Sequence, residues 1–348
     1  MPRSRREVAV AQLSQMQRYL GEEMYEDYQE GLMTRREMLR RVLGICGGAA
    51  AAAALLAACG DARGVATPLP APTNGAAAPT TAPTANPTPA TSSAPTSQPA
   101  ATSQPAPNSS APLAVAADDP AVRAEEVRIP GDAPLSGYLA RPSAAGSYPG
   151  VVVIHENRGL TDHIRDVARR VAKAGYIAIA PDLASRAGGT SKLGSQIQAF
   201  FANAKPDELV ADLNAAVAFL DQQPDIMSGK HGVVGFCFGG AYTLRLAAAN
   251  PTIAAAVCYY GVTPDPASQM AATNAAILGQ YGGNDQRVNS TIPALEQAME
   301  SAGKTYEKRV YDGANHAFNN DTGPNYNQDA AAAAWKDTLA WFEKYLKA

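Results

Sequence analysis

Short apolar, β-branched runs alternate with longer amphipathic segments throughout residues 119–348. The apolar runs predict strands, and GVVVIHE (150–156) is continuous enough for a strand buried on both faces of a sheet. The expected strands are 125–130, 135–142, 150–156, 176–181, 231–237, 254–261, 275–283 and 306–313. The expected helices are 162–175, 207–221, 238–249, 291–302 and 329–347. This alternation predicts an α/β domain with an eight-stranded, mostly parallel, doubly wound sheet and helices on both faces. Functional groups are then expected at the carboxyl ends of the strands.

Residues 60–118 have a different composition. Twelve of the 26 prolines lie between positions 61 and 117, and Arg63 is the one charged residue of the stretch 62–117. The rest is mainly Ala, Thr and Ser, which cannot bury enough apolar surface to offset the entropy lost on ordering. We therefore predict a disordered linker over 60–118 that leads into a separate domain at 119–348.

An export signal is predicted ahead of the linker. TRREMLRR (34–41) is followed by 17 uncharged residues before Cys59, and a positive stretch before an apolar one is typical of such signals. The Arg35-Arg36 pair resembles a twin-arginine (Tat) signal, and LAAC (56–59) resembles a bacterial lipobox, which implies cleavage before Cys59 and a lipid on its sulfur. The alternative is a membrane-spanning anchor, for which the apolar run is short. Residues 34–59 are thus expected to be a lipoprotein signal peptide. The domain would then be tethered to the outer face of a bacterial cell membrane or lie in the periplasm.

Residues 1–33 precede this signal and allow several interpretations. They could be a long extension of the signal, or the true start could be Met33. Residues 7–30 could also form an acidic cytoplasmic helix that is lost on cleavage. Each interpretation leaves residues 1–33 outside the fold of the domain.

The charge and the cysteines limit the possible partners. The net charge is −3, with no basic cluster outside the N-terminal region, so nucleic acid is not expected to bind. Cys237 and Cys258 are the cysteines of the predicted domain, and their spacing matches neither a disulfide framework nor a zinc site. No metal or organic cofactor is implied, and we expect a monomer.

The stretch GFCFGG (235–240) stands between a predicted strand and a predicted helix. This G-x-C-x-G arrangement is the context of a nucleophile elbow, with Cys237 at a helix N-terminus that favours the thiolate. The alternative is a structural cysteine in a tight turn that needs glycine for packing. Deciding between them requires a base and an acid elsewhere in the chain.

A histidine and an aspartate follow Cys237 in the order found in α/β-hydrolases. His316, in DGANHAFNN, comes after the last strand, and Asp285, in QYGGNDQRV, comes after the seventh. Asp312 and Asp182 are alternative acids. Of the remaining histidines, His231 precedes its strand, His163 begins a helix as a solvated residue, and His155 ends the third strand. The order favours Cys237 as nucleophile, His316 as base and Asp285 as the acid that orients it.

These motifs, together with APDLASR (180–186) and HENRG (155–159), resemble the dienelactone hydrolase family over residues 120–347. The resemblance implies an α/β-hydrolase fold and a Cys237–Asp285–His316 triad. It also implies that Glu156 pairs with the thiol in the resting state; by itself Glu156 could equally be an ordinary loop carboxylate.

The resemblance also identifies a substrate site. Family members that bind an anionic lactone use two arginines for its carboxylate. One matches Arg186, which could also be a surface arginine, and the other position holds Asn320 here, so a dienelactone itself is not favoured as substrate. The fold further predicts an oxyanion hole made by the backbone N–H groups of Phe238 and Asn157.

The sequence therefore predicts a carboxylic ester hydrolase that cleaves small-molecule esters or lactones through a thioester acyl-enzyme. Activated esters such as enol lactones and aryl esters are favoured, because a thiolate leaves a tetrahedral intermediate more readily than an alkoxide does. A tethered binding module without catalysis and an acyltransferase that uses the same triad are the competing hypotheses.

Overall fold

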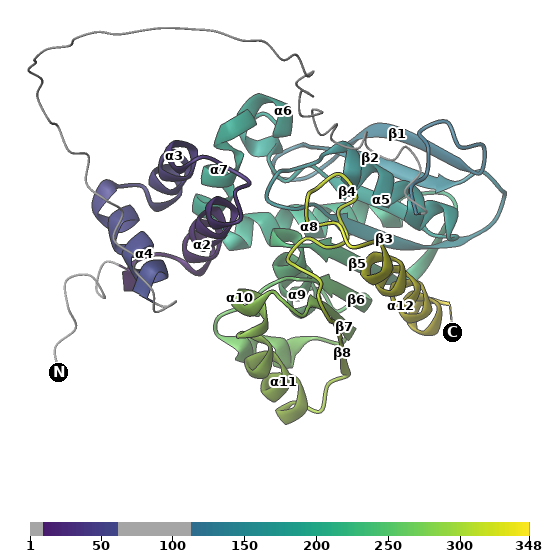
Figure 1. The fold of residues 1–348 in the computed structure, drawn as a ribbon. Helices are drawn as coiled ribbons and strands as arrows, with labels where there is room; N and C mark the ends of the chain where they lie inside the picture. Colours follow the sequence, from purple (N-terminus) through teal and green to yellow (C-terminus); the bar gives the residue numbers. More distant parts are fainter. Residues whose placement is uncertain (1–9, 62–112, 348) are drawn as a thin grey trace, which may run out of the picture.

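An eight-stranded sheet forms the centre of the computed structural model, which describes residues 10–61 and 113–347 (Figure 1). The strands are β1 (Val122–Ile129), β2 (Leu135–Pro142), β3 (Tyr148–Ile154), β4 (Ile177–Pro181), β5 (Ile226–Phe236), β6 (Ile253–Tyr259), β7 (Ala276–Gly282) and β8 (Tyr306–Tyr311). Their order is β1-β2-β4-β3-β5-β6-β7-β8. The six strands β3 to β8 are parallel to one another. Strand β2 pairs antiparallel with both of its neighbours, β1 and β4. The predicted fold class, an α/β-hydrolase sheet, is confirmed.

Helices cover both faces of this sheet. They are α5 (Asp162–Lys173), α6 (Thr190–Leu193), α7 (Ile197–Asn203), α8 (Pro206–Asp221), α9 (Phe238–Ala249), α10 (Gln286–Asn289), α11 (Ile292–Ser301) and α12 (Gln328–Leu346). Helix α5 packs on β2, β3 and β4, and α12 on β5, β6 and β7, whereas α8 and α9 pack together and against the central strands. The predicted helices all occur. Helices α6 and α7 lie in a stretch for which the sequence pattern had predicted no element.

The central strands are buried as their composition predicts. Residues 151–154 of β3 have no exposed surface, because helices cover both sides of a parallel sheet. Small residues allow this close approach: a Cβ at Gly232 in β5 would lie 2.7 Å from Leu346 of α12. β5 begins at Ile226, five residues before the predicted start at His231, and pairs with β3 across a register shift.

The N-terminal region folds against this domain, in contrast to the sequence-based expectation that residues 1–33 lie outside the fold. Helices α2 (Gln15–Gln29), α3 (Arg35–Cys46) and α4 (Ala49–Asp61) pack on one another and on α7, and we call these three helices the N-terminal cap (Figure 1). A Cβ at Gly21 would lie 2.4 Å from Leu55, so α2 and α4 are in close contact. The physical reason is an apolar face on α2, whose residues Met16, Leu20 and Met24 are all buried.

The predicted export signal thus coincides with α3 and α4. Within the described residues no single helix has the length and apolar character to cross a membrane; α3 and α4 together would qualify, but they meet at a bend of 118°. The predicted linker at 60–118 falls almost entirely on residues 62–112, which lie outside the described residues. The boundaries of the signal and the linker therefore remain predictions.

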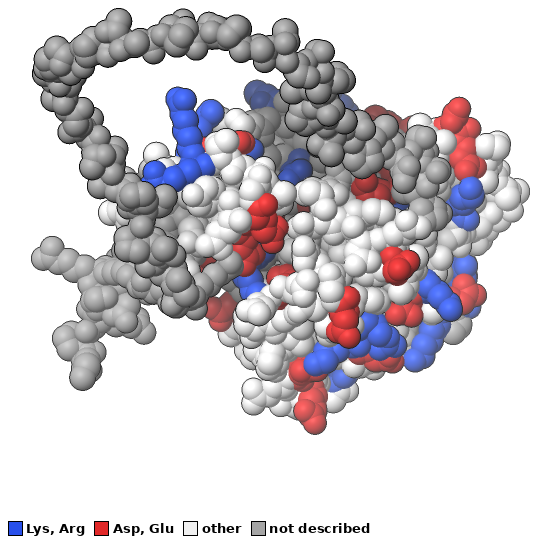
Figure 2. Space-filling model, viewed as in Figure 1, with Lys and Arg blue, Asp and Glu red and all other residues white. Residues whose placement is uncertain are grey.

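Acidic and basic side chains are mixed on the face shown in Figure 2, as the small net charge of −3 suggests. The charges that matter for the candidate site are instead buried where the cap meets the hydrolase domain.

Candidate active site

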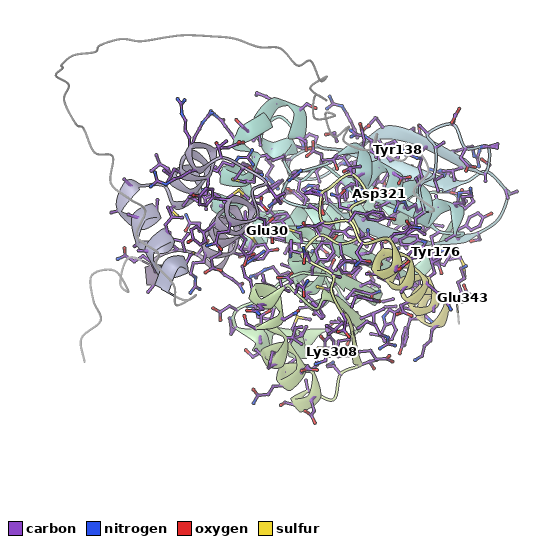
Figure 3. The ribbon with its side chains drawn as sticks, viewed as in Figure 1. Glu30, Tyr138, Tyr176, Lys308, Asp321 and Glu343 are labelled. Carbon is purple, nitrogen blue, oxygen red and sulfur yellow. The ribbon has the colours of Figure 1, made fainter. Side chains whose placement is uncertain are left out.

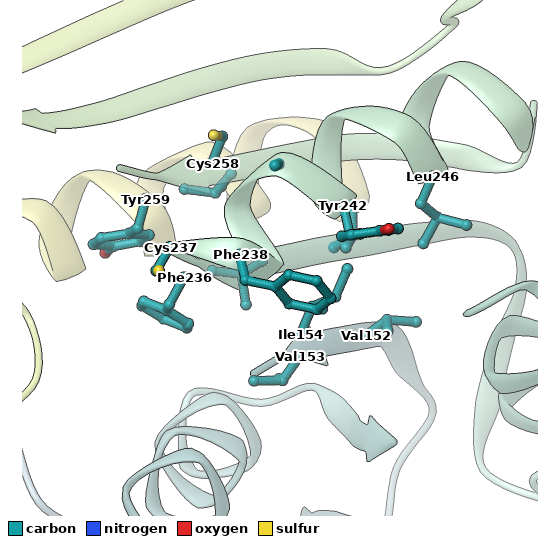
Figure 4. Close-up of a cluster of buried hydrophobic side chains, with 14 of the residues drawn as sticks. Val152, Val153, Ile154, Phe236, Cys237, Phe238, Tyr242, Leu246, Cys258 and Tyr259 are labelled. Atoms are coloured by element: carbon teal, nitrogen blue, oxygen red, sulfur yellow. The ribbon is translucent and has the colours of Figure 1, made fainter. Parts of the chain in front are cut away.

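Cys237 occupies a sharp turn between β5 and α9 (Figure 4). Its backbone has φ 55° and ψ −117°, a strained conformation for a residue with a side chain. Three nearby glycines are needed for close packing. A Cβ added to Gly235 would lie 2.2 Å from the carbonyl oxygen of Gly239. A Cβ on Gly239 would lie 2.4 Å from the carbonyl oxygen of Ile154, and one on Gly240 would lie 2.5 Å from that of Tyr259. The strained backbone and the glycines together form the geometry of a nucleophile elbow.

His316 and Asp285 meet at the same edge of the sheet. The His316 Nδ1 lies 2.5 Å from Asp285 Oδ2, and the two residues follow β8 and β7 respectively. The second ring nitrogen, Nε2, is buried without a hydrogen-bond partner, and a His316 ring nitrogen lies within 4.8 Å of Cys237 Sγ. The structure therefore brings together the three residues that the chain order singled out.

Helix α2 covers this site directly. The Tyr19 hydroxyl lies 3.2 Å from Cys237 Sγ, and both carboxylate oxygens of Glu23 lie 3.6 Å from the same sulfur. Glu23 also accepts a hydrogen bond of 2.7 Å from the side chain of Asn157. Cys237 is consequently only 2% exposed.

The space left beside the thiol is small. The cavity lined by Cys237, His316, Glu156 and the acidic face of α2 has a volume of about 70 Å³. Binding sites for small organic ligands commonly have volumes of about 300–1,000 Å³. A larger groove of about 570 Å³ lies between α2, the end of α4 and α10, but Cys237 does not line it. An ester or lactone therefore has no room beside Cys237 while α2 is in place.

The cap also changes the protonation of the site. Burial raises the pKa of the Cys237 thiol, and the negative charge of Glu23 raises it further, against the opposing effect of His316. The pKa of Asp27, farther along α2, is raised to about 7 by burial and by Glu23. With α2 docked, burial and Glu23 both disfavour the thiolate, which is the nucleophilic form of a cysteine.

His316 and Asp285 shift each other's pKa in opposite directions. Burial acts to lower the pKa of His316, but Asp285 and Cys237 outweigh it, so the net pKa lies well above its usual value. Burial acts to raise the pKa of Asp285, but the positive charges of His316 and Arg287 outweigh it, so the net pKa of Asp285 is lowered. Asp285 therefore stays ionised and orients the imidazole through Nδ1, leaving Nε2 for the thiol.

Comparison with known proteins identifies the family of the chain. The model of the dienelactone hydrolase family matches residues 135–346. The chain belongs to the dienelactone hydrolase family. It is 37% identical over 250 residues to a Methylorubrum extorquens protein described as "Putative carboxymethylenebutenolidase", an alignment that spans 68% of this chain and 86% of the relative. The family and its relatives also give the enzyme class of the chain, which is a carboxylic ester hydrolase.

Solved structures of similar proteins are matched over their whole length. A Klebsiella pneumoniae structure described as "Putative Dienelactone Hydrolase" aligns with a TM-score of 0.61 at 33% identity, covering 65% of this chain and 100% of that one. The dienelactone hydrolase of Anabaena variabilis aligns with a TM-score of 0.53 at 25% identity, covering 65% and 99%. The two solved chains are complete folds, and the 65% of this chain that they match corresponds in size to the hydrolase domain. We therefore expect residues 113–348, the cap-free domain, to fold alone.

Glu156 and Asn320 contact each other. The Asn320 side chain donates a 2.7 Å hydrogen bond to Glu156 Oε2, and both residues line the small cavity. The family resemblance implied that Glu156 pairs with the resting thiol, but the carboxylate in contact with Cys237 is Glu23. Asn320 was expected to face substrate, and its amide is instead committed to Glu156.

Arg186 lies away from the cavity. Its guanidinium forms two hydrogen bonds, of 2.8 and 2.7 Å, with the carboxylate of Asp212 in α8. Asp212 is 2% exposed, so this ion pair anchors the loop after β4 to the helix that follows. Arg186 therefore has its Nε and Nη2 engaged with Asp212 and does not line the cavity beside Cys237.

His163 and Asp321 form part of a buried network. His163 was expected to be solvated, but it is 3% exposed and its Nδ1 lies 2.9 Å from Asp321, which Figure 3 labels in the loop between β8 and α12. Asp321 also pairs with Arg170 of α5. Burial acts to raise the pKa of Asp321, but His163 and Arg170 outweigh it and bring it down to about 2. This buried network holds the loop that carries His316.

Two further histidines and two aspartates are bound elsewhere or lie far from the thiol. His155 Nδ1 lies 2.7 Å from the carbonyl oxygen of Glu156, and His231 Nε2 lies 2.9 Å from Asp221. Asp182 accepts hydrogen bonds from residues 184 and 190 and so shapes its own loop. Asp312 is exposed, four residues before the histidine it would have to orient. Asp285 is thus the acid that the geometry selects.

Two backbone positions complete the site. Phe238 is the first residue of α9, and Asn157 follows β3, whose end packs against the N-terminus of α9. Figure 4 shows Phe238 beside Ile154 at this contact. The backbone N–H groups of Phe238 and Asn157 remain the predicted oxyanion hole.

Glu23, Cys237 and His316 also form the kind of set that can hold a metal ion. Their donor atoms lie within 4.8 Å of one another, and a thiolate, an imidazole and a carboxylate suit a borderline-soft divalent ion. Ligation would use the sulfur and ring nitrogen that the ester reaction needs, so the two uses exclude each other.

The sequence analysis missed Tyr19, Glu23 and Arg287. A signal for the first two was present: Leu13, Met16, Leu20 and Met24 repeat with a helical period, which predicts an amphipathic helix with a surface to cover. No comparable pattern marks Arg287, which lies in the short helix α10 after β7.

Proposed function

We propose that the hydrolase domain cleaves esters or lactones of small carboxylic acids, with Cys237 as nucleophile, His316 as general acid–base and Asp285 as the residue that orients His316. The observation that carries this proposal is the His316–Asp285 contact of 2.5 Å beside a cysteine on a strained elbow. A structural cysteine would require neither the strained backbone nor the buried, unpartnered imidazole nitrogen.

In the first half of the reaction, the Cys237 sulfur attacks the carbonyl carbon and its proton passes to His316 Nε2. The carbonyl π electrons move to the oxygen, which the N–H groups of Phe238 and Asn157 stabilise. The intermediate then collapses, the C–O bond breaks, and the imidazolium protonates the departing oxygen. The products of this half are an alcohol, or the opened ring of a lactone, and a Cys237 thioester.

In the second half, neutral His316 removes a proton from water as the water attacks the thioester carbonyl. The second intermediate breaks its C–S bond, the imidazolium returns its proton to the departing Cys237 sulfur, and the acid is released. Because a thiolate is a better leaving group than an alkoxide, the first intermediate partitions forward only when the ester carries a good leaving group. Enol lactones and aryl esters are therefore the preferred substrates.

A trapped acyl group tests the proposal. We expect the cap-free domain, mixed with 4-nitrophenyl acetate and quenched in acid, to carry one acetyl group on the peptide containing Cys237. Hydroxylamine should remove it, as it removes thioesters. Ester cleavage with the label on another residue, or with no covalent label, would show that Cys237 is not the nucleophile.

We further propose that the protein is exported by the Tat-like signal and lipid-anchored through Cys59. Support comes from the arginine pair and the lipobox, and cleavage before Cys59 would remove α2, α3 and most of α4. Export and exposure of the active site would then be coupled.

The mature N-terminus tests this second proposal. Intact-mass analysis of the membrane fraction of a producing bacterium should give a chain that begins at a diacylated Cys59. A Cys59→Ser variant should keep its N-terminal residues. A wild-type membrane form that retains residues 10–58 would contradict the proposal.

A further inference from the structure

We propose that the closed chain binds one Zn²⁺ ion between Glu23 of the cap and the pair Cys237 and His316 of the hydrolase domain. The ion holds α2 in its docked position over the thiol. Its effect on catalysis rests on the proposed function, whereas binding of the ion does not depend on it.

The three donor atoms lie at distances that suit a small cation. A carboxylate oxygen of Glu23, the sulfur of Cys237 and a ring nitrogen of His316 are all within 4.8 Å of one another. Both Glu23 oxygens lie 3.6 Å from the sulfur. In a tetrahedral site with a Zn–S bond of about 2.3 Å and a Zn–O bond of about 2.0–2.2 Å, the sulfur and oxygen ligands are about 3.5–3.6 Å apart. The thiol and the carboxylate are thus already at the separation that one shared Zn²⁺ requires.

Two further residues orient the donors as the outer partners of metal ligands do. Asp285 lies 2.5 Å from His316 Nδ1, which leaves Nε2 for the ion, and Nε2 is buried without a hydrogen-bond partner. Asn157 donates a 2.7 Å hydrogen bond to Glu23 Oε1 and leaves Oε2 for the ion. Metal-binding histidines commonly have a carboxylate behind them, and metal-binding carboxylates are hydrogen-bonded in turn. Both features are present at this site.

The charge and size of the surrounding cavity also favour a cation. Five carboxylates and two guanidinium groups line it, and one of the two, Arg287, is paired with Glu26. Among the carboxylates, Glu156 is 6% exposed, and its Oε1 has no hydrogen-bond partner. Buried negative charges need a counter-charge or a metal ion. A cavity of about 70 Å³ has room for an ion and a water molecule but not for an ester.

The donor set selects the kind of ion. A thiolate and an imidazole favour Zn²⁺ over Mg²⁺ and Ca²⁺, which take oxygen ligands. Binding forms one Zn–S, one Zn–N and one Zn–O bond, and the proton of the Cys237 thiol passes to a base in the buffer. The sulfur and Nε2 are then unavailable for ester cleavage. Because Glu23 belongs to α2, the same ion joins the cap to the hydrolase domain.

Calorimetry with Zn²⁺ tests the site in a full-length Cys59→Ser chain, in which the half-buried Cys59 cannot compete for the metal. We expect one Zn²⁺ per chain and no comparable binding of Mg²⁺. Glu23→Gln should weaken Zn²⁺ binding at least about tenfold, because loss of even an outer partner of a ligand costs about 10- to 100-fold. Glu22→Gln is the matched control and should leave the affinity unchanged, since Glu22 lines the outer groove and not the cavity. The cap-free domain should bind Zn²⁺ as weakly as Glu23→Gln does.

Two further measurements locate the ion and detect its hold on the cap. Co²⁺ in place of Zn²⁺ should give the absorption band of a cobalt–thiolate bond, and Cys237→Ser should lack that band. Saturating Zn²⁺ should slow amide hydrogen exchange in α2 at least about tenfold, because an ion that prefers the docked state makes opening rarer. The exchange rate should not change in Glu23→Gln, and EDTA should restore the original rate in the chain that carries Glu23.

These measurements use no substrate, so they test the metal site separately from the proposed esterase activity. Failure of the proposed function would appear instead as a metal-free, cap-free domain that is not acylated at Cys237. Equal Zn²⁺ affinity with Glu23 and with Gln at that position, equal affinity of the cap-free domain and the full-length chain, or unchanged exchange in α2 would overturn the proposal. If Glu23→Gln does not fold, the comparison of the full-length chain with the cap-free domain decides the same point.

Discussion

The cap-free domain is expected to hydrolyse 4-nitrophenyl acetate at least about tenfold faster than the full-length chain, because only molecules with α2 undocked can admit substrate. In the closed chain the thiol is 2% exposed, the adjoining cavity is about 70 Å³, and Glu23 raises the pKa of the thiol. Each of these obstacles disappears with α2. Alkylation of Cys237 by iodoacetamide, measured by mass spectrometry, should accelerate in the same proportion.

A substitution in the full-length chain tests the same point without truncation. Leu20 on α2 has no exposed surface, so Leu20→Asp would place a charge in the buried packing of α2 and destabilise its docked position. Leu43→Asp on α3 is the matched control, since Leu43 is 46% exposed. We expect Leu20→Asp, and not Leu43→Asp, to show faster hydrolysis and faster alkylation. Equal rates for the full-length chain, both variants and the cap-free domain would mean that α2 does not restrict access.

Replacing Cys237 by alanine should reduce kcat/KM of the cap-free domain for the same ester by at least about a thousandfold, because no covalent intermediate can form. His316→Ala should cost about 10² to 10⁴, the usual range for general acid–base groups. The double variant should be no slower than Cys237→Ala, because residues that act as one unit give non-additive losses.

Cys258 provides the control for this experiment. It is buried in β6 beside the elbow, as Figure 4 shows, and burial raises its pKa to about 12. Cys258→Ala should therefore change kcat/KM only slightly. Substantial esterase activity in Cys237→Ala, or a comparable loss in Cys258→Ala, would contradict the assignment of the nucleophile.

The surroundings of Arg186 and Arg287 show that sequence motifs do not predict the side-chain contacts of an arginine. The resemblance placed Arg186 on the substrate because it matches a family arginine in the motif APDLASR, but a motif does not reveal that Asp212, 26 residues later, lies in hydrogen-bonding reach of the guanidinium. Arg287 stands in the stretch QYGGNDQRV, but the resemblance gave it no role. That its Nη1 and Nη2 are buried without hydrogen-bond partners is a property of three-dimensional packing.

The sequence by itself determined the fold class and the three residues at the centre of the site. Apolar periodicity is a local property, and it predicted the eight strands and the helices α5, α8, α9, α11 and α12 because those segments bury the faces that the pattern marks. The order Cys237, Asp285, His316 could be recognised because parallel strands place their carboxyl ends along one edge.

Only the tertiary structure decided what surrounds that centre. Residues 10–33 looked separable from the domain because they precede a signal-like segment, yet α2 contributes Tyr19 and Glu23 to the thiol across more than 200 positions of sequence. Such contacts depend on which apolar face finds which surface, and local pattern carries no information about that choice. The same holds for Glu156, whose carboxylate is held by Asn320, so that Glu23 becomes the carboxylate next to Cys237.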